Sequence, residues 1–416
     1  MITLANFVFV LTSILILVQM FLVFRYAIRM DCRKPGESDR SYQPPVTVVL
    51  CLRGCDPSLR ECLSALLDQD YKEYRLLCVL DSQRDPATKI IAEFKQDPRL
   101  QQLISPATDN VCSLKCNSLV TAFEQLEDRI AVLVDADTVP DKHWLSDLVA
   151  PLSEKDVVAA SGNRWFVPVD RRIGSYVRYL WNMAAAPQMD AFKITWGGSL
   201  ALKVGFVKTS GLLDAWRKSL FEDASVAGFA QRSGKRVQML PQLLLPNREG
   251  IGRVDATHWI KRQLLDTRLY HSAFSKVVVH CYSVVALIIV AVGVFLYASI
   301  VKGDGLKSGM VLTMCLVNYV VFYIGVWFVL DKSARDVLKS RGHELPKRRW
   351  LNPKAWFSVI ATQWAYTVAT RQAMKARQVT WRGIEYQVNG PYSIQMAEYH
   401  EMKSSDPDGE SANESL

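Results

Sequence analysis

Three long apolar stretches limit what this chain can fold into. Residues 6–24 carry no charge, and an apolar helix of that length can cross the hydrocarbon core of a bilayer. Two more apolar stretches follow late in the sequence, at roughly 277–301 and 309–330. The link between them, residues 302–308, is short, so we expect the two to form a helical hairpin. The sequence therefore predicts an integral, multi-pass membrane protein with three spanning helices.

Basic residues beside these stretches predict the orientation of the chain. No basic residue precedes the first run, whereas Arg25, Arg29, Arg33 and Lys34 follow it. A cleavable signal peptide has its positive charge first, so we expect a retained anchor. Lys and Arg are also frequent after the hairpin, over 332–349. The positive-inside rule then places the intervening domain in the cytoplasm, at a bacterial inner membrane or on the cytosolic face of an organelle.

The last part of the chain has weaker signals. Residues 355–370 are apolar and contain two Trp but also Gln363, which suits an interfacial helix, with a fourth span as the alternative. The tail is polar and acidic, and we expect it to be disordered. The predicted division is an anchor helix, a cytoplasmic domain, a transmembrane hairpin, a basic cytoplasmic segment with the interfacial or fourth membrane helix, and a disordered tail, at 1–30, 31–275, 276–331, 332–403 and 404–416.

Charge and cysteine content exclude several functional classes. The formal net charge is +9, and Lys and Arg beside a membrane are explained by anionic headgroups. We find no helix-turn-helix, zinc-finger or RNA-binding signature, so we expect no nucleic-acid partner. The nine Cys are scattered and lie mostly in apolar runs, as buried small hydrophobes do. Cys112 and Cys116 have no second Cys pair or His near them in sequence, which argues against a zinc site.

Short buried strands alternate with helices in the expected cytoplasmic domain. Such alternation predicts an α/β fold with a mostly parallel sheet covered on both faces. Asp56 followed by Pro57 predicts the start of a helix, with Asp56 as its cap. From apolar runs and helical spacing, strands are expected at 46–51, 74–80, near Leu103 and at 130–134, and helices at 88–96 and 116–126.

Acidic residues follow several of these segments. Asp81 ends one predicted strand, and Asp135 and Asp137 end another. Glu222 and Asp223 come after a Gly-rich segment. Because parallel strands end at one edge of a sheet, these acids can converge there, where open α/β sheets bind ligands. Carboxylate oxygens suit Mg²⁺ or Mn²⁺ held against a diphosphate. Acids after strands are also common turn formers, and that simpler interpretation remains for Asp81 in particular.

Taken together, these motifs resemble those of family 2-type glycosyltransferases with the GT-A fold, in particular the ceramide glucosyltransferase branch. The resemblance covers roughly residues 44–270 and the membrane segments. The stretches that carry the resemblance are Cys51–Leu59, Leu77–Asp81 with Asp85–Ala87, Lys115–Leu119, Val134–Asp137, Gly197–Ser199 and Glu222–Asp223. The segment 380–386 near the C-terminus also resembles one found after the membrane region in such enzymes.

The resemblance implies roles for the individual residues. Asp81 would accept hydrogen bonds from the uracil or ribose of a UDP-sugar donor. Asp137 would bind Mg²⁺ or Mn²⁺, with Asp135 contributing to both metal and ribose. Lys115 would place a positive charge on the phosphates. Further donor or acceptor contacts are expected from Arg53, Gly197, Gly198 and Arg262.

The resemblance also implies the chemistry. Asp223 would act as the general base that takes a proton from an acceptor hydroxyl while that oxygen attacks the anomeric carbon, which inverts the configuration. Glu222 would point elsewhere or pair with a basic residue.

One motif departs from the family. Where the family usually has Gln or Arg, two residues, and then Arg-Trp, this chain has Arg262 followed at the later positions by Leu265 and Asp266. Trp259, Arg268 and Tyr270 are candidates to compensate. The departure leaves the acceptor site undefined and makes a processive synthase less favoured.

Three functions therefore stand in order. The first is a membrane-bound inverting hexosyltransferase that moves a sugar from a UDP-sugar to a lipid hydroxyl at the cytoplasmic leaflet, in glycolipid biosynthesis. The second is a processive polysaccharide synthase. The third is a degenerate, non-catalytic membrane scaffold. The sequence does not specify the sugar, the acceptor lipid or the oligomeric state.

Overall fold

The structure is a computed structural model that describes residues 2–31, 40–105, 110–297, 300, 305–347 and 352–402. Several sequence-based expectations lie outside these residues. They are the disordered tail at 404–416, residues 302–304 of the hairpin link, and the basic residues Arg33, Lys34, Arg348 and Arg349.

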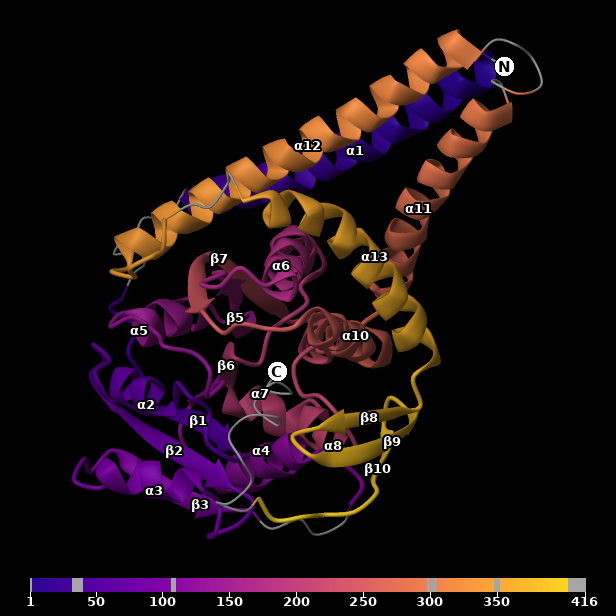
Figure 1. The fold of residues 1–416 in the computed structure, drawn as a ribbon. Coiled ribbons are helices and arrows are strands. Elements are labelled where there is room, and N and C mark those ends of the chain that lie inside the picture. Colours follow the sequence, from indigo (N-terminus) through magenta and orange to yellow (C-terminus); the bar gives the residue numbers. More distant parts are fainter. Residues whose placement is uncertain are drawn as a thin grey trace.

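A seven-stranded sheet forms the centre of the molecule (Figure 1). Its order is β3-β2-β1-β4-β6-β5-β7, and only β6 runs antiparallel to its neighbours. The strands predicted at 74–80 and 130–134 form with those bounds. The α/β, mostly parallel GT-A fold class predicted from the sequence is confirmed. The strands are β1 (Val46–Leu52), β2 (Tyr74–Leu80), β3 (Leu100–Ile104), β4 (Ile130–Val134), β5 (Val157–Phe166), β6 (Ser199–Lys203) and β7 (Arg236–Asn247).

Helices cover both faces of this sheet because successive strand residues point to opposite sides. In β1, Val48 and Leu50 pack with α2 on one face, whereas Val49 packs with α4 on the other. Each fully buried side chain of this size contributes about 1.5–3 kcal/mol relative to exposure. The covering elements are α2 (Leu59–Leu67), α3 (Ala87–Glu93), α4 (Leu114–Gln125), α5 (Trp144–Val149), η1 (Ala150–Ser153), α7 (Val204–Thr209), α8 (Leu212–Trp216) and α9 (Val226–Arg232).

The predicted start of the first of these helices was wrong. Helix α2 begins at Leu59, with Ser58 as its N-cap residue. The Asp56 carbonyl accepts a hydrogen bond from the Leu59 amide, but the Asp56 side chain does not cap the helix. Both carboxylate oxygens of Asp56 instead accept hydrogen bonds from Arg382, at 3.0 and 2.8 Å. A bidentate contact with a guanidinium is stronger than a neutral cap hydrogen bond, so the distant Arg382 decides where this side chain points.

Three helices in the described part of the chain are long and apolar enough to cross a membrane. They are α1 (Ile2–Asp31), α11 (Phe274–Tyr297) and α12 (Gly305–Ser340), and they match the three predicted stretches. In Figure 1, α1 and α12 lie side by side and extend away from the sheet. Helix α13 (Pro353–Lys375) covers the stretch expected to be interfacial or a fourth span, and it is not among the three.

Ion pairs attach the long helices to the sheet domain. Arg29 at the end of α1 pairs with the buried Asp190 of α6 (Ile173–Phe192). Arg341, just after α12, contacts Asp141 and Asp147 at 2.6 and 2.9 Å. Some of the basic residues that indicate orientation therefore also hold the domain against the helices.

The end of the chain returns to the domain. Strands β8 (Gln378–Trp381), β9 (Ile384–Gly390) and β10 (Ser393–Met396) form an antiparallel sheet of their own. It packs against α10 (Arg253–Tyr270), and Leu265 of that helix shares a buried cluster with Ile384 and Tyr386 of β9. No sequence pattern indicates that these strands reach the sheet edge where the acids lie.

Candidate active site

The direction of the strands brings the predicted site residues to one edge of the sheet. Arg53 and Asp81 follow β1 and β2, and Asp135 follows β4, all parallel. Because β6 is antiparallel, its first residue, Ser199, lies opposite Val134 at the end of β4. The two glycines that precede β6 therefore start at the edge where the acids of β4 end.

Lys115 connects two of the acids. Its ammonium lies 2.8 Å from Asp135 Oδ1 and 2.8 Å from Glu222 Oε1. Burial acts to lower the pKa of Lys115, but the two carboxylates outweigh it and raise the pKa well above its usual value. The expectation that Glu222 pairs with a basic residue is confirmed. Burial also raises the pKa of Glu222 to about 7.

Asp135 and Asp137 face a buried arginine that sequence reasoning missed. Arg164 in β5 lies 3.5 Å from Asp135 Oδ2 and 3.9 Å from Asp137 Oδ2. Its guanidinium also lies over the Trp196 ring, 4.7 Å from the ring centre. Burial acts to raise the pKa of Asp135, but Lys115 and Arg164 outweigh it and hold that pKa below its usual value. A signal was present, since a charged residue inside an apolar strand needs a partner.

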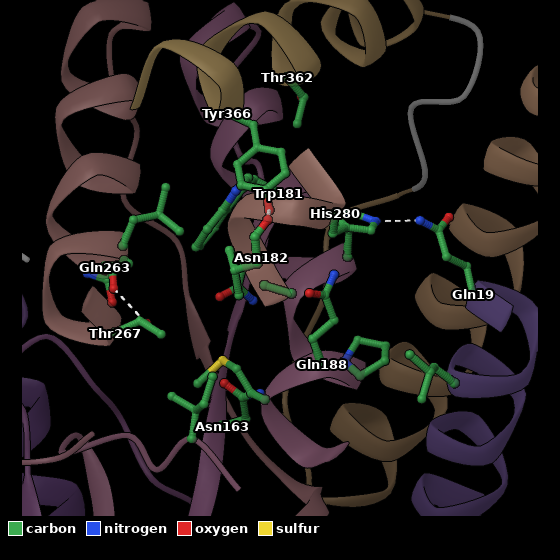
Figure 2. A pocket seen from close by; sticks show the side chains of 18 of the residues that line it. Gln19, Asn163, Trp181, Asn182, Gln188, Gln263, Thr267, His280, Thr362 and Tyr366 are labelled. Carbon is green, nitrogen blue, oxygen red and sulfur yellow. Dashed lines mark hydrogen bonds between the residues drawn. The ribbon is translucent and has the colours of Figure 1, made fainter. Parts of the chain in front are cut away.

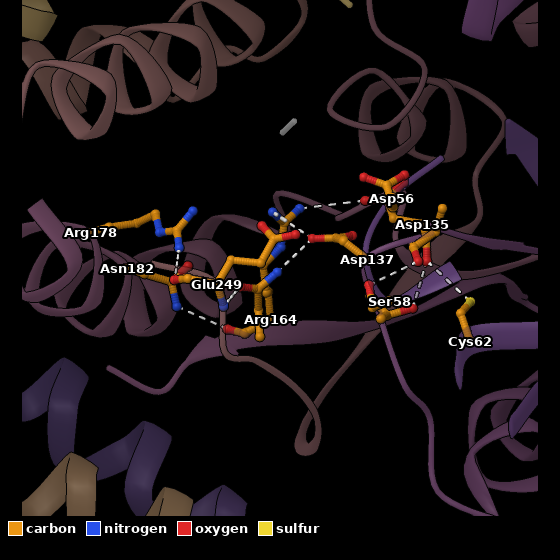
Figure 3. A network of polar contacts seen from close by, with 12 residues as sticks. Asp56, Ser58, Cys62, Asp135, Asp137, Arg164, Arg178, Asn182 and Glu249 are labelled. Atoms are coloured by element: carbon orange, nitrogen blue, oxygen red, sulfur yellow. Dashed lines mark hydrogen bonds and ion pairs between the residues drawn. The ribbon is translucent and has the colours of Figure 1, made fainter. Parts of the chain in front are cut away.

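Figure 3 shows the network that continues from Arg164. The Arg164 carbonyl accepts a hydrogen bond from the Asn182 side chain at 2.9 Å. The Glu249 carbonyl accepts one from the Arg178 guanidinium at 2.5 Å. On the other side, Asp137 Oδ2 accepts a hydrogen bond from Asn247 at the end of β7. Polar residues from β4, β5, α6 and β7 thus meet at the sheet edge.

Asp137 has the features of a metal ligand. Its Oδ1 atom is buried and accepts no hydrogen bond from the described residues. Burial raises the pKa of Asp137 to about 7, so the bare carboxylate is costly without a cation. Hard oxygen donors of this kind suit Mg²⁺ or Mn²⁺. The described residues contain no group of three or more His, Cys, Asp or Glu side chains placed to hold a metal ion.

Asp223 is held in one orientation by backbone groups. Its Oδ2 accepts a hydrogen bond from the Gly197 amide at 2.8 Å, and its Oδ1 accepts one from the Ala224 amide at 2.9 Å. A Cβ on Gly197 would lie 2.0 Å from Glu222 Oε1, and one on Gly198 would lie 2.5 Å from Asp135 Oδ2. In this structure the absent side chains therefore allow the backbone to approach the acids.

Arg53 and Asp81 form an ion pair at the far end of the site. The second carboxylate oxygen of Asp81 is buried and accepts no hydrogen bond from the described residues. A pocket connects this pair with Lys115 and Asp135, and its wall includes Trp381. It has the positive and negative groups that a nucleoside diphosphate would meet.

Helix α10 contributes the residues at the altered motif. Arg262 lies over the Trp381 ring at 5.9 Å. Burial lowers the pKa of Arg262 to about 9, and the nearby Arg164 and Arg382 lower it further. Burial also raises the pKa of Asp266 well above its usual value, and the neighbouring Asp223 raises it further.

Figure 2 shows a second, largely apolar pocket. Its lining includes Asp223, Asp266 and Trp259 together with residues of the long helices α1, α11 and α12. Among its polar side chains are Gln363 of α13 and His280 of α11, which contacts Gln19 of α1.

The family model for glycosyl transferase family 21 matches residues 7–393. The chain belongs to glycosyl transferase family 21. The match includes most of α1, all of α11 and α12, the sheet domain and strands β8 and β9, and it ends at the first residue of β10. Membership of this family supports glycosyl transfer as the function of the chain.

Solved structures resemble the family 21 chain only distantly. A mannosyltransferase from Pyrobaculum calidifontis in complex with GDP-Man and Mn²⁺ has a TM-score of 0.46 and 18% identity, and the match covers 88% of this chain and 99% of that one. TarS 1–349 from S. aureus has a TM-score of 0.34 and 14% identity, with 84% and 98% covered. No curated protein matches the chain.

Proposed function

We propose that this chain is an inverting, metal-assisted hexosyltransferase of the ceramide glucosyltransferase type. It moves a sugar from a UDP-sugar onto the hydroxyl of a membrane lipid at the cytoplasmic leaflet. The observation that carries this proposal is the apolar pocket, which connects Asp223 with the long helices α1, α11 and α12.

The donor would occupy the pocket between Asp81 and Asp135. Asp81 would accept hydrogen bonds from the nucleoside, and Lys115 would place its charge beside the diphosphate. A divalent cation, held by Asp137 and Asp135, would stabilise negative charge on the leaving nucleoside diphosphate. The buried Oδ1 of Asp137, which accepts no hydrogen bond from the described part of the chain, supports this assignment.

Asp223 would act as the base. The Gly197 and Ala224 amides hold its carboxylate in the wall of the apolar pocket. It would take the proton of the acceptor hydroxyl as that oxygen bonds to the anomeric carbon and the bond from this carbon to the diphosphate oxygen breaks. Attack from the face opposite the diphosphate inverts the anomeric configuration.

The pocket also indicates what kind of lipid enters. Buried polar atoms that have no hydrogen-bond partner among the described residues lie in its wall, among them Trp259 Nε1, Asp266 Oδ1 and Gln363 Nε2. They would bind a head group with several hydrogen-bonding groups. Among the described residues of the wall, the only Lys or Arg is Arg164, which already faces Asp135 and Asp137. A neutral lipid therefore fits this wall better than a lipid phosphate.

The test is sugar transfer by the detergent-solubilised full chain with Mn²⁺, a set of radiolabelled UDP-sugars and a total lipid extract. We expect a labelled product in the organic phase. Asp223→Asn should reduce its formation by roughly 10²–10⁴-fold, the usual contribution of a general base, while UDP binding persists. Asp214→Asn is the matched control, because the Asp214 side chain is 85% exposed on α8.

Two other results would contradict the proposal. Label found only in long water-soluble polymer would indicate a processive polysaccharide synthase. Absence of Mn²⁺-dependent UDP binding by the wild-type chain would favour the non-catalytic scaffold.

A further inference from the structure

The hairpin between β8 and β9 enters the donor side of the site from the end of the chain. Its residues Trp381 and Arg382 line the same pocket as Arg53, Lys115 and Asp135. They follow α13, which lines the apolar pocket through Gln363. One continuous segment after the membrane helices therefore contacts both pockets.

Arg382 is fixed where it stands. Its guanidinium contacts both oxygens of Asp56, and its Nη1 donates a hydrogen bond to the Arg53 carbonyl at 3.3 Å. The Arg382 carbonyl in turn accepts a hydrogen bond from Arg53 Nε at 3.1 Å. Its φ of +51°, followed by +73° at Gly383, is that of a two-residue hairpin turn, because Trp381 and Ile384 on either side are paired.

Trp381 lies closer to the reacting end of the site. Its ring is 5.9 Å from that of Phe221, two residues before the proposed base Asp223. Arg262 from α10 lies over the same ring. Of the two hairpin residues, Trp381 therefore lies towards Asp223, and Arg382 lies towards Arg53 and Asp56.

In α10, the residues at and near the altered motif pack against the β8–β9 hairpin and do not provide the arginine and tryptophan that the family usually has there. Leu265, at the position where the family has Arg, packs in one buried cluster with Ile384 and Tyr386 of the hairpin. Arg268 donates hydrogen bonds to the carbonyls of Ala373, Met374 and Ala376 just before β8. The hydroxyl of Tyr270 accepts a hydrogen bond from the Leu220 amide. Arg268 and Tyr270 are thus engaged in structural contacts.

We propose that Trp381 and Arg382 bind the sugar nucleotide, with the Arg382 guanidinium on the diphosphate and the Trp381 ring against the donor sugar. The inference rests on the proposed function, because it assumes a sugar nucleotide in this pocket. It assigns to the C-terminal hairpin the cation and the aromatic ring that α10 lacks at positions 265 and 266. A guanidinium suits this role because its planar donors match phosphate oxygens.

The experiment measures binding of UDP, with Mn²⁺, to the detergent-solubilised full chain by calorimetry. Arg382→Lys keeps a charge near Asp56, and Arg382→Asn suits the positive φ. We expect the affinity for UDP to fall about tenfold in the first and up to about a hundredfold in the second. The matched control is Arg377→Lys, an exposed arginine just before β8. Melting temperatures of all variants show whether the hairpin still folds.

Trp381 is tested with the sugar present. Trp381→Ala should leave the affinity for UDP within about twofold while it raises the donor KM about tenfold, and Trp381→Phe should restore most of that loss.

Failure of the two proposals can be distinguished. Wild-type chain that binds no UDP would overturn the proposed donor and this inference together. Wild-type chain that binds and transfers, with Arg382 variants as tight as the Arg377 control, would overturn the inference alone.

Discussion

Replacement of Arg164 by Met should show how much the acid cluster, Asp135 and Asp137, depends on one buried cation. The Arg164 side chain is 6% exposed and faces Asp135 and Asp137, which are 9% and 0% exposed. Loss of one member of a buried ion pair leaves the partner charge without compensation and costs about 3–5 kcal/mol. Met retains most of the packing volume between Trp196 and Phe166, so the change removes mainly the charge.

Arg236 provides the matched control. It also faces two acids, Glu154 and Asp156, but its side chain is 42% exposed. Solvent screens such pairs, and Arg236→Met should cost less than about 1 kcal/mol.

Thermal unfolding of the two variants in detergent, without metal or nucleotide, measures the difference. At about 2–4 °C per kcal/mol for a domain of this size, Arg164→Met should lower the melting temperature by about 6–20 °C and Arg236→Met by no more than about 4 °C. Equal, small shifts for the two variants would refute the reasoning, because the acids would then not need Arg164.

Three further predictions follow from the site and the pockets. Burial raises the pKa of Glu222 from its usual value of 4.5 to about 7. Between these two pH values the folded chain keeps a proton that the unfolded chain releases, so the free energy of unfolding decreases as the pH rises from about 4.5 to about 7. Glu222→Gln should make the fall in melting temperature between pH 5 and pH 7.5 shallower, and an unchanged slope would contradict this. Gly198→Ala places a Cβ 2.1 Å from the Trp196 ring and should cost about 1–3 kcal/mol and most of the activity, whereas Gly205→Ala, with open space around it, should cost nothing measurable by thermal unfolding and transfer assay. Gln363→Leu should raise the KM for the lipid acceptor about tenfold and leave the affinity for UDP unchanged, and a change in UDP affinity instead would place Gln363 outside the acceptor pocket.

The strands and their terminal acids could be predicted because their signals are local. The run at 130–134 is apolar, β-branched and closed by Asp135, and it forms β4 with those bounds. The approach of Gly197 and Gly198 to the same acids could not be predicted in this way. It depends on β6 being antiparallel, and strand direction is a property of the sheet as a whole.

The buried arginine and asparagine of the acid cluster illustrate a different gap. Arg164 and Asn247 lie in or at the end of strands whose other residues form the core, so periodicity identifies the strand and not the partner. The predicted start of α2 was wrong for a related reason, because the Asp56 side chain pairs with Arg382 from far along the chain and does not cap the helix.

The sequence by itself determined the three apolar helices, the alternating strands and helices, and the acids that follow the strands, since each depends on neighbours within a few turns or on charge next to an apolar run. Only the tertiary structure decided that Arg382 meets Asp56, 326 positions earlier, and that the apolar pocket connects Asp223 with α1 and α12. Such contacts arise from the way separate layers pack against each other. Packing of this kind leaves no periodic signal in the chain, because each partner alone resembles an ordinary turn, strand or membrane-helix residue.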